Sequence, residues 1–150
     1  MHIVMISTWP PRFCGIAIYA EQLVNALRKD GNKVSIISHT DGGREGESDV
    51  YPIIDMTKPD WYMPLIDKIN ELNPDVVHVQ HEYGIYSRLL PGGRFDYGAR
   101  TSFVIADFLY RLKLAKKPVV VTYHSIVKDL PVEEKIYLNH TLDLAAANIF

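Results

Sequence analysis

Three short stretches of the chain combine residue types that bind anions and hydroxyl groups. The first is Thr8–Ala17, which carries an arginine, a cysteine, a glycine and two prolines after an apolar run. The other two place a histidine beside polar or aromatic residues after valine-rich runs, at His81-Glu82-Tyr83 and Tyr123-His124-Ser125. A helix that begins near Ile16 would leave free N–H groups at its start, where an anion can bind. We therefore expect a ligand site built around the first stretch.

The elements that must position these stretches follow from the hydrophobic pattern. Short, almost continuously apolar runs are typical of strands buried on both faces of a parallel sheet. They predict strands at His2–Ser7, Lys33–Ser38, Val50–Ile54, Asp75–Gln80 and Pro118–Tyr123, with a sixth beginning at Asn148. Helical spacing separates them, over about 16–29, 59–72, 99–116 and 131–146. This alternation predicts a doubly wound α/β domain with a mostly parallel, Rossmann-like sheet.

Two predictions concern particular segments. In the first helix the spacing predicts that Ile16, Tyr19, Ala20, Leu23 and Leu27 share the inward face. The segment from His81 to Tyr97, rich in glycine and proline, is predicted to be a long loop, and such loops are usually functional or mobile.

The three chemical stretches are expected to converge. In doubly wound sheets the ligand lies beyond the carboxyl ends of the strands, near the switch in strand order. With the common order 3-2-1-4-5, the first, fourth and fifth strands are neighbours, so the loops that follow them would line a single crevice.

Several of these residues also have a simpler, structural explanation. Gly15 is a residue that a turn can require, and no hydrolase or protease motif surrounds Cys14, which favours a small loop residue over a nucleophile. His78 is expected to be a packed histidine within its strand. A metal site from His78, His81 and Glu82 remains an alternative, although strand alternation would point the two histidines to opposite faces.

Composition narrows the class of protein. The chain has 150 residues, 47% apolar and 23% charged, with a formal net charge of −2, so no positive field would attract nucleic acid. Apolar runs are too short for a membrane span, and the single cysteine fits a reducing compartment, so a cytoplasmic protein is expected. A basic cluster at 111–117 suits the end of a helix, and contact with the anionic inner face of the membrane is an alternative explanation. The Gly-x-Gly-x-x-Gly, P-loop and Gly-x-Ser-x-Gly motifs are absent, which argues against dinucleotide, P-loop and esterase chemistry.

The three stretches together resemble the family 4 glycosyltransferases. Trp9–Tyr19 resembles the opening of that family, Asp75–Tyr86 its His-Glu-aromatic-Gly-Ile segment, and Pro118–Ser125 the strand that ends in its donor-site histidine. The matches occur in the family's order and cover essentially the whole chain. The resemblance implies one half of a two-domain GT-B enzyme that transfers a sugar from a nucleotide-sugar donor with retention of configuration.

The resemblance also implies roles for individual residues. The backbone N–H of Gly15, with Cys14 and Ile16 beside it, would approach the donor diphosphate, although Cys14 stands where family members often have a second glycine. His124 would hydrogen-bond the donor sugar near the reacting centre and is the implied catalytic residue. Contacts with the acceptor or donor sugar are implied for Arg12, His81, Glu82, Tyr83 and Ser125. The family's usual mechanism needs no metal ion and no cofactor besides the nucleotide-sugar co-substrate.

The whole chain, 1–150, is accordingly expected to be an N-terminal, acceptor-side domain. The family's C-terminal nucleotide-sugar-binding domain does not fit within this length, so the chain alone should not catalyse transfer to its sugar or lipid-linked acceptor. Whether it is a truncated gene or one part of a split enzyme stays open. A stand-alone α/β module that binds a ligand or protein without chemistry is the alternative.

Overall fold

The structure is a computed structural model of residues 1–150, and it describes all of them except 83, 87, 91–93, 97–98, 126–127 and 131. Its strands are β1 (His2–Ser7), β2 (Lys33–His39), β3 (Val50–Ile54), β4 (Val76–His81), β5 (Arg88–Leu90), β6 (Arg94–Asp96), β7 (Val119–Tyr123) and β8 (Ala147–Ile149). Its helices are α1 (Gly15–Lys29), α2 (Met63–Leu72), α3 (Ala99–Leu114) and α4 (Val132–Leu144).

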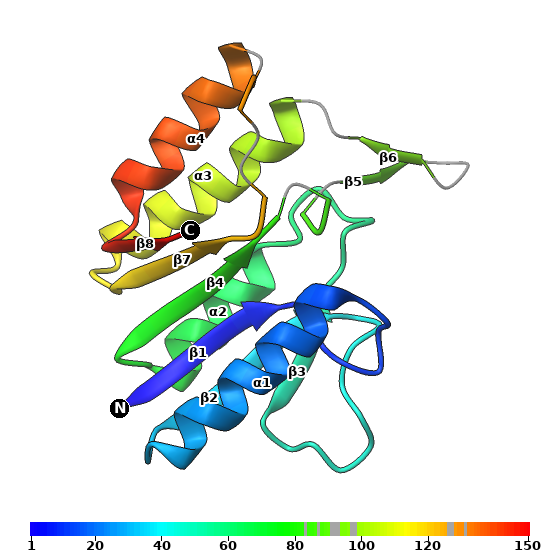
Figure 1. Ribbon diagram of the computed structural model, residues 1–150, viewed down its shortest axis with the longest axis vertical. Coiled ribbons are helices and arrows are strands. Elements are labelled where there is room, and N and C mark those ends of the chain that lie inside the picture. Colours follow the sequence, from blue (N-terminus) through cyan, green and yellow to red (C-terminus); the bar gives the residue numbers. More distant parts are fainter. Residues whose placement is uncertain (83, 87, 91–93, 97–98, 126–127, 131) are drawn as a thin grey trace.

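A six-stranded parallel sheet runs through the molecule in the order β3-β2-β1-β4-β7-β8 (Figure 1). The predicted doubly wound α/β fold is confirmed, and so is the predicted order that makes β1, β4 and β7 neighbours. The register places Met5 opposite His78, and Gln80 opposite Thr122. Because side chains alternate along each strand, these four residues lie on the same face of the sheet.

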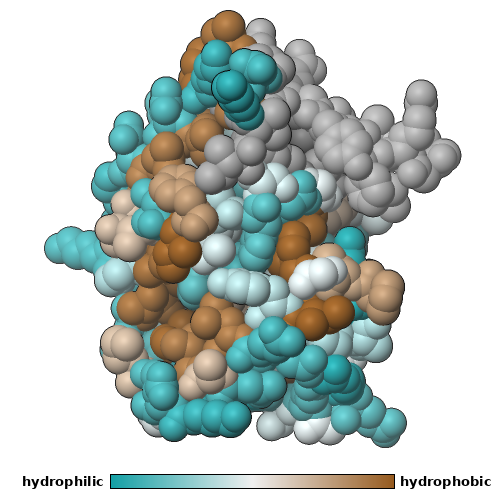
Figure 2. Space-filling view, in the orientation of Figure 1, coloured by the Kyte–Doolittle hydropathy of each residue, from teal (hydrophilic) through white to brown (hydrophobic). Residues whose placement is uncertain are grey.

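The helices cover the sheet unequally. Helix α1 packs on one face, against a core cluster that includes Met5, Ala20 and Val24. Helices α2, α3 and α4 pack on the other face, around a larger cluster to which Val79 and Tyr137 belong. On the α1 face, hydrophobic side chains reach the surface toward the side where β7 and β8 lie (Figure 2).

The inward face of helix α1 differs from the predicted one. Its buried residues are Ala17, Ala20 and Val24, small side chains that allow the helix to approach the sheet closely. Ala20 agrees with the prediction, whereas Tyr19 is 41% exposed and lies at the edge of the helix–sheet interface. The prediction is wrong for Tyr19 because small side chains, rather than the large ones at helical spacing, are the buried residues of this helix.

Two further segments differ from their predictions. Helix α2 begins at Met63 rather than near 59, with Pro64 in its first turn, where a residue without an N–H is tolerated. The segment predicted as one long loop from His81 contains the antiparallel pair β5–β6, which projects from the body of the molecule (Figure 1). No helix among the described residues is long and apolar enough to cross a membrane.

Candidate functional site

The carboxyl ends of β1, β4 and β7 lie side by side at one edge of the sheet. The contact between β4 and β7 continues to their ends, where the His124 N–H donates to the His81 carbonyl at 2.9 Å. The structure therefore brings two of the predicted stretches together directly. The third follows β1, on the other side of β4.

The His124 side chain lies between Tyr19 of α1 and Gln80 of β4. Its ring meets the edge of the Tyr19 ring, with centroids 5.0 Å apart and planes at 82°. Its Nε2 lies 2.9 Å from Gln80 Oε1. Burial lowers the pKa of His124, and the negative charge of Glu82 opposes that shift only in part. The ring is therefore held in one orientation and is neutral near pH 7.

Glu82 forms a tight turn directly after β4. Its Oε2 accepts the Gly84 N–H at 2.6 Å, and a Cβ on Gly84 would lie 2.8 Å from that oxygen and displace the carboxylate. Since its charge also acts on His124, Glu82 lies near that ring. Ser125 is partly buried beside His124 in the chain, and Tyr83 lies outside the described residues.

The structure places the His81 ring in the interior. It is 2% exposed, its Nε2 contacts the Tyr137 hydroxyl, and it packs against the rings of Tyr86 and Tyr123. Burial lowers the pKa of His81 to about 4, with a smaller contribution from His124. His81 thus supports the strand end from the α4 side, and its ring offers almost no surface to a ligand.

His78 and His81 point to opposite faces of the sheet, as strand alternation predicts. His78 Nε2 lies 2.8 Å from Thr122 Oγ1, on the α1 face, whereas His81 contacts Tyr137 of α4. Within the described ranges, no three His, Cys, Asp or Glu side chains are grouped so that they could hold a metal ion.

The loop after β1 leads into the N-terminus of α1 through Cys14, which occupies the N-cap position. Burial alone would raise the pKa of the Cys14 thiol, but the N–H groups of Ala17 and Ile16 and the Thr8 hydroxyl lower it below its ordinary value. These N–H groups therefore favour negative charge at this point. Gly15 is exposed, and a Cβ placed on it would meet nothing within 4 Å.

A cavity of about 270 Å³ opens at the same edge, toward β2 and β3. Its walls come from the last residues of β2 and β3 and from the segments that follow β1, β2, β3 and β4: Arg12, His39, Thr40, Asp41, Ile54, Asp55, Met56, Thr57, Gly84 and Ile85. Arg12 lies 3.4 Å from Asp41, and Asp55 accepts the Thr57 hydroxyl at 2.6 Å. The cavity thus presents a guanidinium, carboxylates and hydroxyls, which are groups that bind a polyhydroxylated ligand.

His39 ties two walls of this cavity together. It is buried at the end of β2, and its Nε2 lies 2.6 Å from the Ile85 carbonyl, in the segment after β4. Burial lowers the pKa of His39, so the ring is neutral and donates one N–H to that carbonyl. The bond fixes the position of the turn that begins at Glu82.

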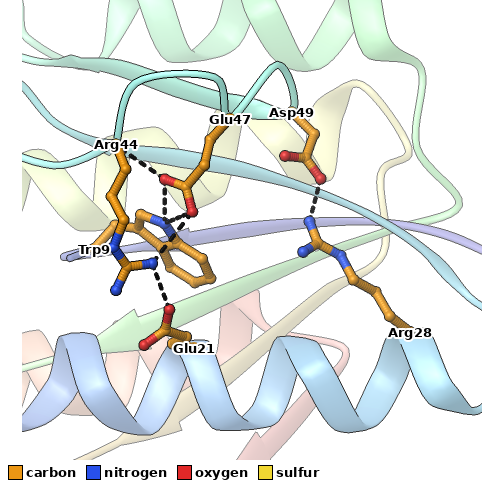
Figure 3. A network of polar contacts seen from close by, with 6 residues as sticks. All are labelled: Trp9, Glu21, Arg28, Arg44, Glu47 and Asp49. Carbon is orange, nitrogen blue, oxygen red and sulfur yellow. Dashed lines mark hydrogen bonds and ion pairs between the residues drawn. The ribbon is translucent and has the colours of Figure 1, made fainter. Parts of the chain in front are cut away.

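The segment between β2 and β3 is held against α1 by the contacts in Figure 3. The buried Trp9 indole donates to the Glu47 carboxylate at 3.3 Å, and Glu47 also accepts the Arg44 main-chain N–H at 2.7 Å. Arg44 pairs in turn with Glu21 of α1 at 2.6 Å. One wall of the cavity is therefore anchored to the helix that carries Gly15.

Sequence reasoning missed two groups of residues in this region. The cavity residues after β2 and β3 are not among the predicted site residues, because the three chemical stretches follow only β1, β4 and β7. Tyr19 and Gln80 lie within a predicted helix and a predicted strand and are therefore not placed in the predicted site. Strand alternation is a signal that could have found Gln80. It places Gln80 and His78 of β4 on the face that also carries Thr122 of β7 and His124 directly after it.

The chain belongs to glycosyltransferase family 4, because the model of that family matches residues 13–150. The resemblance of the three stretches to this family is thereby confirmed. No curated protein matches the chain.

Solved structures of an alpha-glucosyltransferase share the fold. One is in complex with UDP and a 13-mer DNA containing a central A:G mismatch, with a TM-score of 0.60 and 17% identity over 99% of this chain. Another, with UDP and a 13-mer DNA containing an HMU base, has a TM-score of 0.58 and 17% identity over 97% of this chain. This chain spans only about a third of their length, 36% and 34%.

Proposed function

We propose that the chain is the acceptor-side domain of a retaining glycosyltransferase that uses a nucleotide-sugar donor and needs a second domain for turnover. The observation that carries this proposal is the convergence, at one sheet edge, of a helix N-terminus, a neutral histidine and a polar cavity. The helix N-terminus would bind the diphosphate, the histidine would contact the transferred sugar, and the cavity would hold the acceptor.

The donor diphosphate would approach the N-terminus of α1, where the N–H groups of Gly15 and Ile16 lie beside Cys14. The lowered thiol pKa of Cys14, to which the Ile16 N–H contributes, supports this, because the N–H groups that stabilise a thiolate also stabilise a phosphate oxygen. The open space above Gly15 would let a phosphate come close to the backbone. A donor with a nucleoside diphosphate is in keeping with the UDP bound by the structural neighbour.

The transferred sugar would contact His124, with Glu82 and Ser125 beside it. A neutral imidazole held against Gln80 offers one nitrogen to a sugar hydroxyl without a cost for reorientation in the transition state. His81 would act on the sugar only through the strand end that it supports, since its ring is 2% exposed. Tyr83 remains a proposed contact.

The acceptor would enter the cavity beside Arg12. A volume of about 270 Å³ lies just below the range of about 300–1,000 Å³ that drug-sized ligands occupy, so one sugar ring or a polyol of that size would fill it. The turn that begins at Glu82 connects the cavity with His124, because Gly84 lines the cavity and donates to Glu82. Donor and acceptor would therefore meet at this turn.

The proposal is tested by assaying the intact protein that contains this domain with a panel of nucleotide sugars and polyol acceptors. We expect transfer from one class of donor, with the product carrying the anomeric configuration of the donor, in a chelator as well as in added metal. A product of inverted configuration, or tight donor binding without transfer to any acceptor, would count against it. The second result would favour a binding module instead.

A further inference from the structure

The Gln80 side chain joins two histidines inside the sheet. Its amide is fully buried, at 0% exposure, on the α1 face of β4. Its Nε2 lies 3.2 Å from Met5 Sδ and 3.2 Å from His78 Nε2, and its Oε1 lies 2.9 Å from His124 Nε2. A buried amide needs partners for its N–H groups and its carbonyl, and these three groups supply them.

The sulfur of Met5 determines which way the amide faces. A thioether has no hydrogen to donate and is only a weak acceptor, so the group beside it must be the NH2 of Gln80. The reverse orientation would put the amide oxygen against the Met5 sulfur, two acceptors in contact. Burial lowers the pKa of His78 to about 4, so His78 is neutral and its Nε2 can accept from Gln80. Thr122 Oγ1 also lies 2.8 Å from this nitrogen.

This orientation leaves the Gln80 carbonyl facing His124. A carbonyl can only accept, so His124 Nε2 must carry the proton that it shares. A neutral imidazole has one N–H, and His124 Nδ1 therefore has a lone pair. In the part of the chain that the structure describes, this Nδ1 has no hydrogen-bond partner, so it can accept a hydroxyl from outside the domain.

We propose that Gln80 is a positioning residue that fixes His124 as the Nε2–H tautomer, so that Nδ1 accepts a hydroxyl of the transferred sugar. Met5 sets the orientation of the Gln80 amide, and this orientation in turn decides which nitrogen of His124 carries the proton. This inference rests on the proposed function for its catalytic consequence, whereas the tautomer itself is a property of the free protein.

The titratable and charged groups around the His124 ring come from two elements and one turn. Tyr19 faces it from α1, His78 and His81 interact with it from β4, and Glu82 lies in the turn after β4. Both β4 histidines are neutral near pH 7, since burial lowers the pKa of each to about 4. Among the residues that the structure describes, Glu82 is thus the charged group that acts on the His124 ring at that pH.

The tautomer is measured by nitrogen NMR on the 15N-histidine-labelled protein, without substrate. A protonated ring nitrogen and a lone-pair nitrogen have well-separated shifts. We expect His124 to be protonated on Nε2 alone in the unmodified protein and to become a mixture of tautomers in Gln80→Met. Protonation of His124 on Nδ1 in the unmodified protein, or an unchanged single tautomer in Gln80→Met, would overturn the inference.

Sugar transfer by the same variants tests the catalytic consequence. We expect Gln80→Met to lower kcat about tenfold, with a change in donor KM of less than about threefold, because the lost orientation acts in the transition state. Ser35→Ala, which removes the partly buried contact of 3.0 Å between Ser35 Oγ and His2 Nε2 at the opposite end of the sheet, is the matched control and should leave kcat unchanged. Equal losses in the two variants would mean a merely structural role.

Gln80→Glu adds a readout that a packing defect would not give. A carboxylate beside Nε2 raises the pKa of His124, so at neutral pH both ring nitrogens carry protons and Nδ1 cannot accept. Activity should therefore be low at neutral pH and recover as the pH rises through the raised pKa. A loss that is equal at all pH values would contradict the inference. If His124→Ala left transfer intact, the proposed function would fail while the NMR result would still stand.

Discussion

Under the proposed function, Gly15 would be required by a ligand rather than by the fold. Its φ is not among the positive values in the chain, and a Cβ there would meet no atom within 4 Å. Neither turn geometry nor packing therefore requires glycine at this position. Gly31 is the opposite case, because its φ of +82° at the end of α1 lies in the left-handed region that favours glycine.

Gly15→Ala should separate these two requirements. We expect an unchanged or slightly raised Tm, since alanine is the better helix former, together with a clear loss of kcat/KM for the nucleotide sugar. Gly31→Ala is the control: it should cost about 1 kcal/mol of stability with kcat/KM unchanged. Thermal unfolding and donor kinetics on both variants make the comparison. Full activity in Gly15→Ala would show that the diphosphate does not bind close to Gly15 at the helix N-terminus.

The two buried histidines of β4 make stability depend on pH. Their pKa values are lowered to about 4 in the folded protein, below the ordinary 6.5 of the unfolded chain, so the unfolded state binds more protons in between. Stability is therefore fully present above pH 6.5 and is lost as the pH falls toward 4. Between pH 6.5 and 5 each histidine should contribute a loss on the order of 2 kcal/mol.

Denaturant unfolding at a series of pH values measures this dependence. His81→Gln, which keeps a group able to bond the Tyr137 hydroxyl but does not titrate, should lower the slope. His140→Gln on the exposed side of α4 is the matched control and should leave the slope unchanged. A flat profile in the unmodified protein would show that neither ring is buried as described.

At the scale of elements, the loop between β2 and β3 takes its position from Glu47. This carboxylate accepts from the buried Trp9 indole, while its ion pair with Arg44 at 3.3 Å lies at the surface. Surface ion pairs contribute little, whereas an unpaired buried donor is costly. The hydrogen bond to Trp9, not the charge, should therefore carry the stability.

Two substitutions separate charge from hydrogen bonding at Glu47. Glu47→Gln keeps an oxygen for the indole and should change the free energy of unfolding by less than about 0.5 kcal/mol, whereas Glu47→Leu should cost about 1–2 kcal/mol. Denaturant unfolding at low and high salt gives both values. A large, salt-sensitive loss in Glu47→Gln would mean that the ion pairs dominate.

At the scale of the whole molecule, the sequence predicts what depends on periodicity and topology. The runs of apolar residues predict the six strands of the parallel sheet, though not β5 and β6, and the common strand order predicts the shared edge of β1, β4 and β7. Side-chain direction was harder to foresee. His81 was expected to contact a sugar, but a one-residue difference from Gln80 turns it to the face that α4 covers.

The cavity also lay beyond prediction from sequence. Its walls come from four separate segments, and nothing in the spacing of Arg12, Asp41 and Asp55 indicates that they meet. Their contact depends on how the loops after β2 and β3 fold back, which is fixed by bonds such as that from His39 to the Ile85 carbonyl. Long-range contacts of this kind leave no periodic pattern in the sequence.

The proposed function depends on His124, the residue proposed to contact the transferred sugar. The most direct measurement is sugar transfer by the intact protein that contains this domain, with His124→Ala compared with His140→Ala, an exposed histidine on α4. We predict that His124→Ala lowers kcat on the order of a hundredfold, as expected for loss of a positioned group in the active site, with Tm changed little and His140→Ala fully active. Near-normal turnover in His124→Ala would contradict the account.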